Sequence, residues 1–191
     1  MHTVILYGGA NTDTELAAIH DLLTDALAAG GATVESLRVA DMKIHPCVGC
    51  FGCWLKTPGE CLIDDDGRTV ARALVQCDLR VFLTPVSFGG YGGVLKTAVD
   101  RVVPTISPLF VKVNGEMHHR LRYPNPPSLL AVGWQRQPNP AGADIFAQLV
   151  QRNAINMHAP ASGSLVLTGT QTTNEQRALL TGILRQVGVA A

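Results

Sequence analysis

Four of the five cysteines lie within sixteen positions, in the segment PCVGCFGCWLKTPGEC at 46–61. Their spacing is Cys47-x2-Cys50-x2-Cys53-x7-Cys61. Thiolates spaced C-x2-C-x2-C, with one more cysteine nearby, are able to surround a single [4Fe–4S] cluster. Zinc is an alternative guest, although its usual four-thiolate site consists of two separated C-x2-C pairs. The third alternative is a tightly packed loop with free thiols, so the elements around the loop have to be considered.

Composition excludes several classes of protein. Lys and Arg number 15 against 15 Asp and Glu, so no basic surface for nucleic acid or an anionic membrane is indicated. No apolar run approaches the roughly 18 residues that span a bilayer. The first ten residues, MHTVILYGGA, lack the basic region of a signal peptide. We therefore expect a cytoplasmic protein with reduced cysteines and with neither nucleic acid nor membrane as a partner.

Short apolar, β-branched runs alternate with segments of helical periodicity along the whole chain. This alternation predicts a parallel sheet covered by helices on both faces, namely a flavodoxin-like, doubly wound α/β fold with five strands. We expect residues 1–191 to form one such domain, and 104–127 to be a Pro-rich irregular connection. The predicted strands are 3–9, 33–39, 78–86, 128–133 and 163–169, and the predicted helices are 13–31, 67–76, 92–103, 142–156 and 174–187.

In folds of this kind the ligand binds beyond the carboxyl ends of the strands, where the strand order reverses. For five strands that point lies between the first and third. The loop after the first strand reads GGANTDTEL at 8–16, with amide and hydroxyl donors before a helix. Such a helix N-terminus suits a phosphate, although the same residues also serve as ordinary helix caps.

The loop after the third strand belongs to the segment TPVSFGGYGGVLKTAVDR at 84–101, which contains four glycines. Glycines beside the predicted reversal point leave main-chain groups open to a flat ligand, and Phe88 and Tyr91 are able to line it. A flexible turn is the alternative, but the position favours binding.

Two segments resemble a known family. PVSFGGYGGVLKTAVDR is similar to the P-V-Y-x-G-x-x-x-x-L-K-x-x-x-D-R segment of NAD(P)H-dependent FMN reductases, which are flavodoxin-like proteins. The cysteine segment resembles a loop in the branch that contains the iron–sulfur flavoproteins. The resemblance covers about residues 1–105. It implies non-covalently bound FMN, a homodimer or higher homo-oligomer with the flavin near the subunit interface, and electron transfer from NAD(P)H to a small-molecule acceptor such as a quinone or a flavin.

By the same resemblance, the flavin site is carried over position by position. The phosphate loop is shorter than the family's G-S-P-R-x-x-G-N-T and lacks its Ser and Arg. The flavin carries the chemistry, so no catalytic acid or base is nominated. The implied phosphate site is Gly9, Asn11, Thr12 and Thr14, and the implied isoalloxazine site is Pro85, Val86, Ser87, Phe88, Gly89 and Gly90.

Two questions stay open at this point. Iron–sulfur flavoproteins carry such a compact cysteine motif, but cluster-free relatives carry similar cysteines, so free thiols are favoured over a [4Fe–4S] cluster or zinc. The alternative to an enzyme is an electron carrier or redox sensor that serves a protein partner. Electron-carrier flavodoxins are strongly acidic, whereas this chain is neutral, which favours the enzyme.

The segment 104–127 offers two further expectations. Its polar part contains His118, His119, Arg120 and Arg122, which we interpret as a solvated loop or a dimer contact. Its apolar members are costly to leave in water, and we expect them to pack on a second subunit and help to cover the flavin; they are Ile106, Leu109, Phe110 and Val111.

Overall fold

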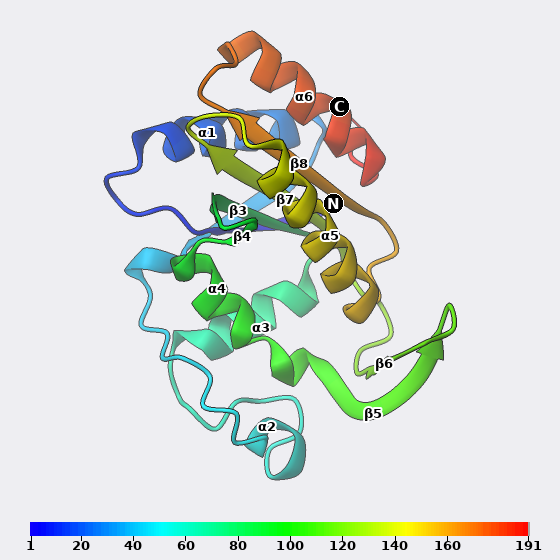
Figure 1. Ribbon diagram of the computed structural model, residues 1–191. Helices are drawn as coiled ribbons and strands as arrows, with labels where there is room; N and C mark the ends of the chain where they lie inside the picture. Colours follow the sequence, from blue (N-terminus) through cyan, green and yellow to red (C-terminus); the bar gives the residue numbers. More distant parts are fainter. Residues whose placement is uncertain (191) are drawn as a thin grey trace.

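A parallel sheet forms the centre of the computed structural model, which describes residues 1–190 (Figure 1). The strand order is β2-β1-β3-β7-β8, so the chain reverses direction across the sheet between β1 and β3. A short strand β4 (Gly90–Tyr91) pairs antiparallel with β3. The predicted flavodoxin-like fold is confirmed. The five parallel strands are β1 (His2–Tyr7), β2 (Thr33–Arg38), β3 (Leu79–Ser87), β7 (Ser128–Gln135) and β8 (Ser162–Thr168).

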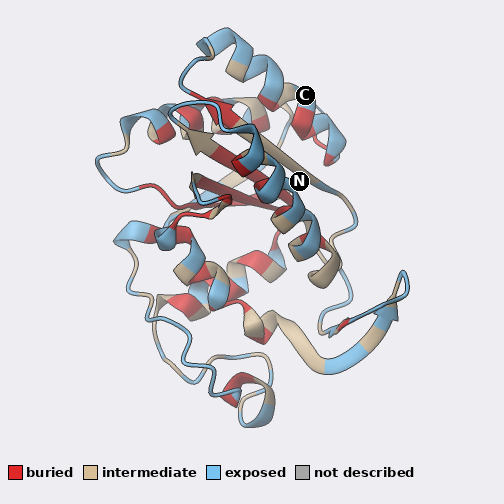
Figure 2. Ribbon diagram, in the orientation of Figure 1, coloured by how far each residue is buried: buried red, intermediate tan, exposed pale blue. Residues whose placement is uncertain are grey.

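The helices cover both faces of the sheet, as Figure 1 shows. One apolar core lies under α1 (Thr14–Ala29) and α6 (Thr173–Gln186). The second core lies under α3 (Asp66–Gln76), α4 (Gly93–Asp100) and α5 (Pro140–Asn156). Central strands such as β1 and β3 are buried over most of their length (Figure 2), which explains their nearly continuous apolar sequences.

Three short helical turns connect these elements. They are η1 (Val39–Asp41), α2 (Gly52–Leu55) within the cysteine segment, and η2 (Val103–Thr105). Among the helices of residues 1–190, none combines the length and the hydropathy needed to cross a membrane.

The segment 104–127 is not irregular, and that prediction is wrong. It forms a separate hairpin of β5 (Ile106–Val113) and β6 (Glu116–Leu121) that projects from the body of the molecule (Figure 1). Asn114 and Gly115 both have positive φ, which is the backbone that a two-residue Asn-Gly turn requires. The carboxylate of Glu116 pairs with Arg152 of α5 at 2.5 Å and fixes the hairpin to that helix.

Candidate functional site

A cavity of about 580 Å³ lies at the carboxyl ends of β1, β3 and β7. It is the place where the strand order reverses, as expected for the ligand site of this fold. Three neighbouring strands of the sheet, β1, β3 and β7, contribute to its walls through their ends or the loops that follow them. The lining residues are Ala10, Thr12, Asp13, Glu15, Pro85, Val86, Trp134, Gln135, Arg136, Gln137 and Asn139.

The structure brings the two predicted loops together around this cavity. Thr12 of the first loop and Pro85 and Val86 of the second are among the lining residues. The other predicted residues lie beside the cavity in the same loops rather than in its lining. They are Gly9, Asn11 and Thr14 in the first loop, and Ser87, Phe88, Gly89 and Gly90 in the β3–β4 turn.

The first loop leads directly into helix α1. The side chain of Asp13 caps this helix by accepting a hydrogen bond from the main-chain N–H of Leu16 at 3.0 Å. A helix leaves its first N–H groups without intrahelical partners, so others remain for an anionic ligand. Gly9 has a packing role, because a Cβ there would lie 2.6 Å from the Tyr7 hydroxyl. Packing therefore requires Gly9 whether or not phosphate binds.

Cations reach the first loop from neighbouring strand ends. Arg38, the last residue of β2, lies 4.6 Å above the Tyr7 ring, and its Nη2 is 3.5 Å from the side-chain oxygen of Asn11. Asn11 in turn donates to Asp41 at 2.8 Å. Arg38 also pairs with Asp41 at 3.5 Å, so these contacts place an ion pair beside a loop that contains neither Lys nor Arg. Sequence reasoning missed Arg38 because it inspected only the loops after the first and third strands.

The turn between β3 and β4 is unusually constrained. Ser87 pairs with Gly90, so the turn contains only Phe88 and Gly89, and both have positive φ, 50° and 77°. That is the backbone of a type I′ hairpin, in which Asn and Gly are the preferred residues. Phe88 is 104% exposed and contributes no packing. A Cβ at Gly89 would lie 2.6 Å from Ile145 of α5, which explains that glycine.

The third wall of the cavity was not predicted. It is formed by residues at the end of β7 and just after it, notably Trp134, Gln135 and Arg136. Arg136 reaches Glu15 of α1 at 3.4 Å and so closes one side of the cavity. Asn139 caps α5 by accepting the N–H of Gly142 at 3.0 Å. This wall could have been predicted, because β7 is also a parallel strand and its carboxyl end lies next to that of β3.

These walls fit FMN. The N-terminus of α1 offers N–H groups to a phosphate, and Pro85, Val86 and Trp134 offer apolar surface to a flat ring. Two carboxylates, those of Asp13 and Glu15, oppose an anion at the same end. Hydrogen bonding at the helix N-terminus lowers the pKa of Glu15, so this carboxylate is charged at neutral pH.

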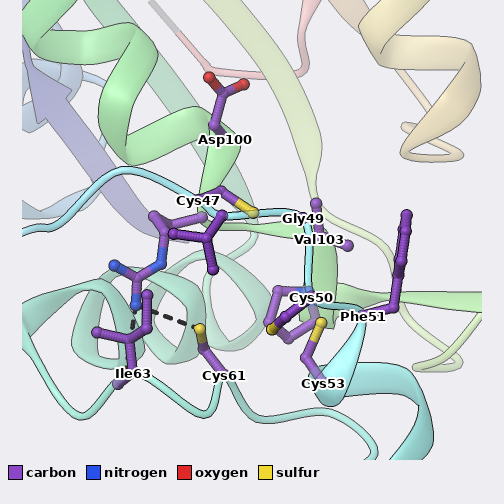
Figure 3. Close-up of a pocket in the computed structure, with 12 residues that line it drawn as sticks. Cys47, Gly49, Cys50, Phe51, Cys53, Cys61, Ile63, Asp100 and Val103 are labelled. Atoms are coloured by element: carbon purple, nitrogen blue, oxygen red, sulfur yellow. Dashed lines mark hydrogen bonds between the residues drawn. The ribbon is translucent and has the colours of Figure 1, made fainter.

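A second cavity, of about 190 Å³, is surrounded by the cysteine segment. All four of its thiols line it: Cys47, Cys50, Cys53 and Cys61. In Figure 3, Cys50, Cys53 and Cys61 lie close together, and Cys47 lies farther along the same cavity. Apart from these thiols the walls are largely apolar, with Ile63, Val103 and Pro104 among them. Burial raises the pKa of the Cys53 thiol.

The size of this second cavity bears on what it could hold. By the same measure, a cavity needs only about 10–15 Å³ to admit one water molecule. Within residues 1–190, no three or more His, Cys, Asp or Glu side chains are arranged to hold a single metal ion. Four thiols around one zinc ion would each lie about 2.3 Å from it, so they would have to move inward. The cavity therefore suits a polyatomic centre better than a single ion.

The polar residues of the hairpin make contacts within or next to it. His118 is buried and bonds Glu116 at 2.9 Å, and His119 bonds the main-chain oxygen of Ser107 at 2.8 Å. Arg122 donates to the main-chain oxygen of Ile106 at 3.3 Å, and Arg120 is exposed. None of these four lines either cavity described above.

The profile of a single protein family, described as NADPH-dependent FMN reductase, matches residues 1–122 of this chain. The chain belongs to that family. Membership confirms the predicted family. The description of the family names NADPH and FMN.

Sequence relatives of this chain are named iron–sulfur flavoproteins, which confirms the predicted resemblance to that branch. One, from Methanocaldococcus jannaschii, is 35% identical over 80 residues, or 42% of this chain and 40% of that protein. Another, from Archaeoglobus fulgidus, is 32% identical over 74 residues, or 39% of this chain and 33% of that protein. The chain thus matches less than half the length of these relatives.

Solved structures resemble this chain over nearly its whole length. An NAD(P)H:quinone oxidoreductase from Methanothermobacter marburgensis has a TM-score of 0.70 and 15% identity, covering 98% of this chain and 97% of that one. An FMN-dependent NADH-azoreductase from Bacillus anthracis, in complex with FMN, has a TM-score of 0.65 and 11% identity, covering 95% and 94%. At such low identity these likenesses establish the fold alone.

Proposed function

We propose that the protein transfers electrons from NAD(P)H, through bound FMN, to a small acceptor such as a quinone or a free flavin. The observation that carries this proposal is the 580 Å³ cavity at the strand reversal, which unites both predicted loops. When bound, FMN supplies the two-electron and one-electron chemistry, and the protein supplies binding and orientation.

Each wall has a distinct part in this proposal. The first N–H groups of α1, with Thr12, would hold the phosphate, and Arg136 would offset the charge of Glu15. The wall of Pro85, Val86 and Trp134 would exclude water from one side of the ring. These assignments are supported by position and chemistry.

The proposal is tested by FMN binding and by turnover. Purified protein should bind FMN in a one-to-one ratio and oxidise NADH or NADPH with a quinone or free flavin as acceptor. Trp134→Ala should weaken FMN binding, because it removes a large apolar part of the wall. Trp54→Ala, a matched control in the cysteine segment, should leave FMN affinity unchanged. An FMN affinity that is unchanged in Trp134→Ala would contradict the proposed site.

We infer a second function for the cysteine segment, that of holding a [4Fe–4S] cluster, which would supply one-electron transfer. The sequence alone favours free thiols. The observation that favours a cluster is that four thiols line one cavity of 190 Å³, a size that suits a polyatomic centre. The relatives named iron–sulfur flavoproteins support the same proposal.

Iron analysis of protein purified without oxygen and without reconstitution decides between these alternatives. A cluster predicts about four irons per chain, which Cys50→Ser should remove while FMN stays bound, because the two cavities share no lining residue. Cys77→Ser is the matched control, since Cys77 is buried elsewhere. Free thiols predict negligible iron in the unmodified protein.

A further inference from the structure

Arg101 is a charged residue enclosed beside the cysteine cavity. It lies immediately after α4, and its side chain is 0% exposed. Both ends of its guanidinium group bond the carboxylate of Asp65, at 2.8 Å each, and the side chain of Asp65 is 4% exposed. Burying two charges is costly and is tolerated only when other hydrogen bonds satisfy them. The remaining contacts of Arg101 therefore need an explanation.

Those remaining contacts go to Cys61 and to two residues that flank the cysteine segment, His45 and Ile63. Nη1 donates to the main-chain oxygen of His45 at 2.6 Å, just before the first cysteine. Nη2 donates to the main-chain oxygen of Ile63 and to Sγ of Cys61, both at 3.3 Å, as the dashed lines in Figure 3 show. One guanidinium group thus joins both ends of the segment and contacts one of its thiols directly.

Asp65 completes the same arrangement from the other side. Besides Arg101, it accepts hydrogen bonds from the main-chain N–H of His45 at 2.9 Å and of Gly67 at 2.9 Å. Burial raises its pKa, but the hydrogen bonds from Arg101 and His45 outweigh this, and the pKa lies well below its usual value. Asp65 is therefore a fixed negative charge next to the fixed positive charge of Arg101.

We propose that Arg101 is the positioning residue of the cysteine site: it holds Sγ of Cys61 in place and makes the cluster easier to reduce, while Asp65 moderates that effect. This proposal rests on the cluster proposed above. Reduction adds one electron to the cluster, with no bond formed or broken. A positive charge whose N–H group points at a ligand sulfur stabilises the more negative, reduced state. The carboxylate of Asp65 acts in the opposite direction.

The opposite charges of Arg101 and Asp65 allow a test that distinguishes this proposal from a purely structural role. Arg101→Gln and Asp65→Asn both break the same buried ion pair, so both should lower the melting temperature. Their effects on the cluster should differ in sign. In a reductive titration with dithionite under argon, Arg101→Gln should shift the midpoint potential of the cluster downward, and Asp65→Asn should shift it upward. The midpoint potential of FMN in the other cavity should move less in both variants.

Arg68→Gln is the matched control. Arg68 also contacts Cys61, but its Nε donates to the main-chain oxygen at 2.8 Å instead of the sulfur, and its side chain is 26% exposed. The same loss of charge should therefore change the potential much less than Arg101→Gln does. Arg101→Lys keeps the charge but not the two-pronged geometry, so it should give a smaller downward shift than Arg101→Gln.

Each outcome is decisive. If Arg101→Gln does not fold or does not bind iron, the midpoint potential of the cluster in Asp65→Asn still tests the proposal, because it should shift upward. Potentials that move in the same direction in both variants, or in neither, would overturn the role of Arg101 while leaving the cluster intact. Unmodified protein without iron would overturn the cluster and this proposal together, so the two failures are distinguishable.

Discussion

Replacing Phe88 by Asn should make the protein more stable, although Phe88 lies in a predicted FMN-binding loop. Phe88 has a φ of 50°, and left-handed backbone costs a bulky residue about 1–2 kcal/mol. Asn adopts this conformation readily and is a preferred residue of the type I′ turn. The phenyl ring is fully exposed, so its removal forfeits no packing within the chain.

We expect Phe88→Asn to raise the free energy of unfolding of the FMN-free protein by about 1 kcal/mol. For a chain of this size that gain corresponds to about 2–4 °C in melting temperature. If Phe88 contacts bound FMN as predicted, the same variant should bind FMN more weakly. A residue that lowers stability and raises ligand affinity is what backbone strain at a functional site would produce.

Phe51→Asn is the control for this experiment. Phe51 also has a positive φ, of 53°, but its ring stacks on Trp54 with the centroids 5.2 Å apart. The relief of strain there is offset by lost stacking, so its melting temperature should rise less. Thermal unfolding without FMN and fluorescence titration with FMN measure the two effects separately. A lower melting temperature for Phe88→Asn would refute the strain argument, and unchanged FMN affinity would remove Phe88 from the site.

Three further predictions concern other parts of the chain. Asp13→Asn keeps the helix cap but removes a negative charge, so FMN should bind more tightly by about 1 kcal/mol, or roughly fivefold in Kd; weaker binding would contradict the phosphate site. Folding lowers the pKa of Asp65, so the stabilisation that its carboxylate gives is present above about pH 4 and is lost as the pH falls. The difference in unfolding free energy between the unmodified protein and Asp65→Asn should therefore become smaller below pH 4. A difference that stays constant with pH would contradict this prediction. The hairpin exposes Leu109, Phe110 and Met117, so sedimentation should detect a homodimer that Phe110→Glu weakens; an unmodified monomer with FMN bound would contradict this.

The sequence predicted the parts of the fold that local patterns determine. Leu16, Ile19, Leu23 and Leu27 recur at helical spacing, and all four are buried in α1. The hairpin is an exception: Asn114-Gly115 is a strong local turn signal, but the prolines on both sides of it favour an irregular connection. Both the helix and the turn depend on residues that are close together in the sequence.

The sites were predicted only in part, because their completion depends on residues distant in sequence. Trp134 lines the cavity proposed for FMN, although it lies 127 positions beyond Tyr7, the last residue of β1. Cys61 gains its guanidinium neighbour from a residue 40 positions away. Spacing among the cysteines says nothing about Arg101, which the fold brings to Cys61 from the end of α4. Short-range patterns thus identified the loops but not their partners.

Helix α4 explains why one sequence motif spans both cavities. The segment 85–101 begins with Pro85 and Val86 in the wall of the FMN cavity and ends with Arg101 at the cysteine cavity. Between them, the eight residues of α4 span about 12 Å. Inserting one residue in this helix would turn Arg101 by about 100° and move it about 1.5 Å along the axis. Its paired contacts with Asp65 would then be lost. The length of α4 is therefore constrained, because Pro85 and Val86 have to line one cavity while Arg101 reaches the other.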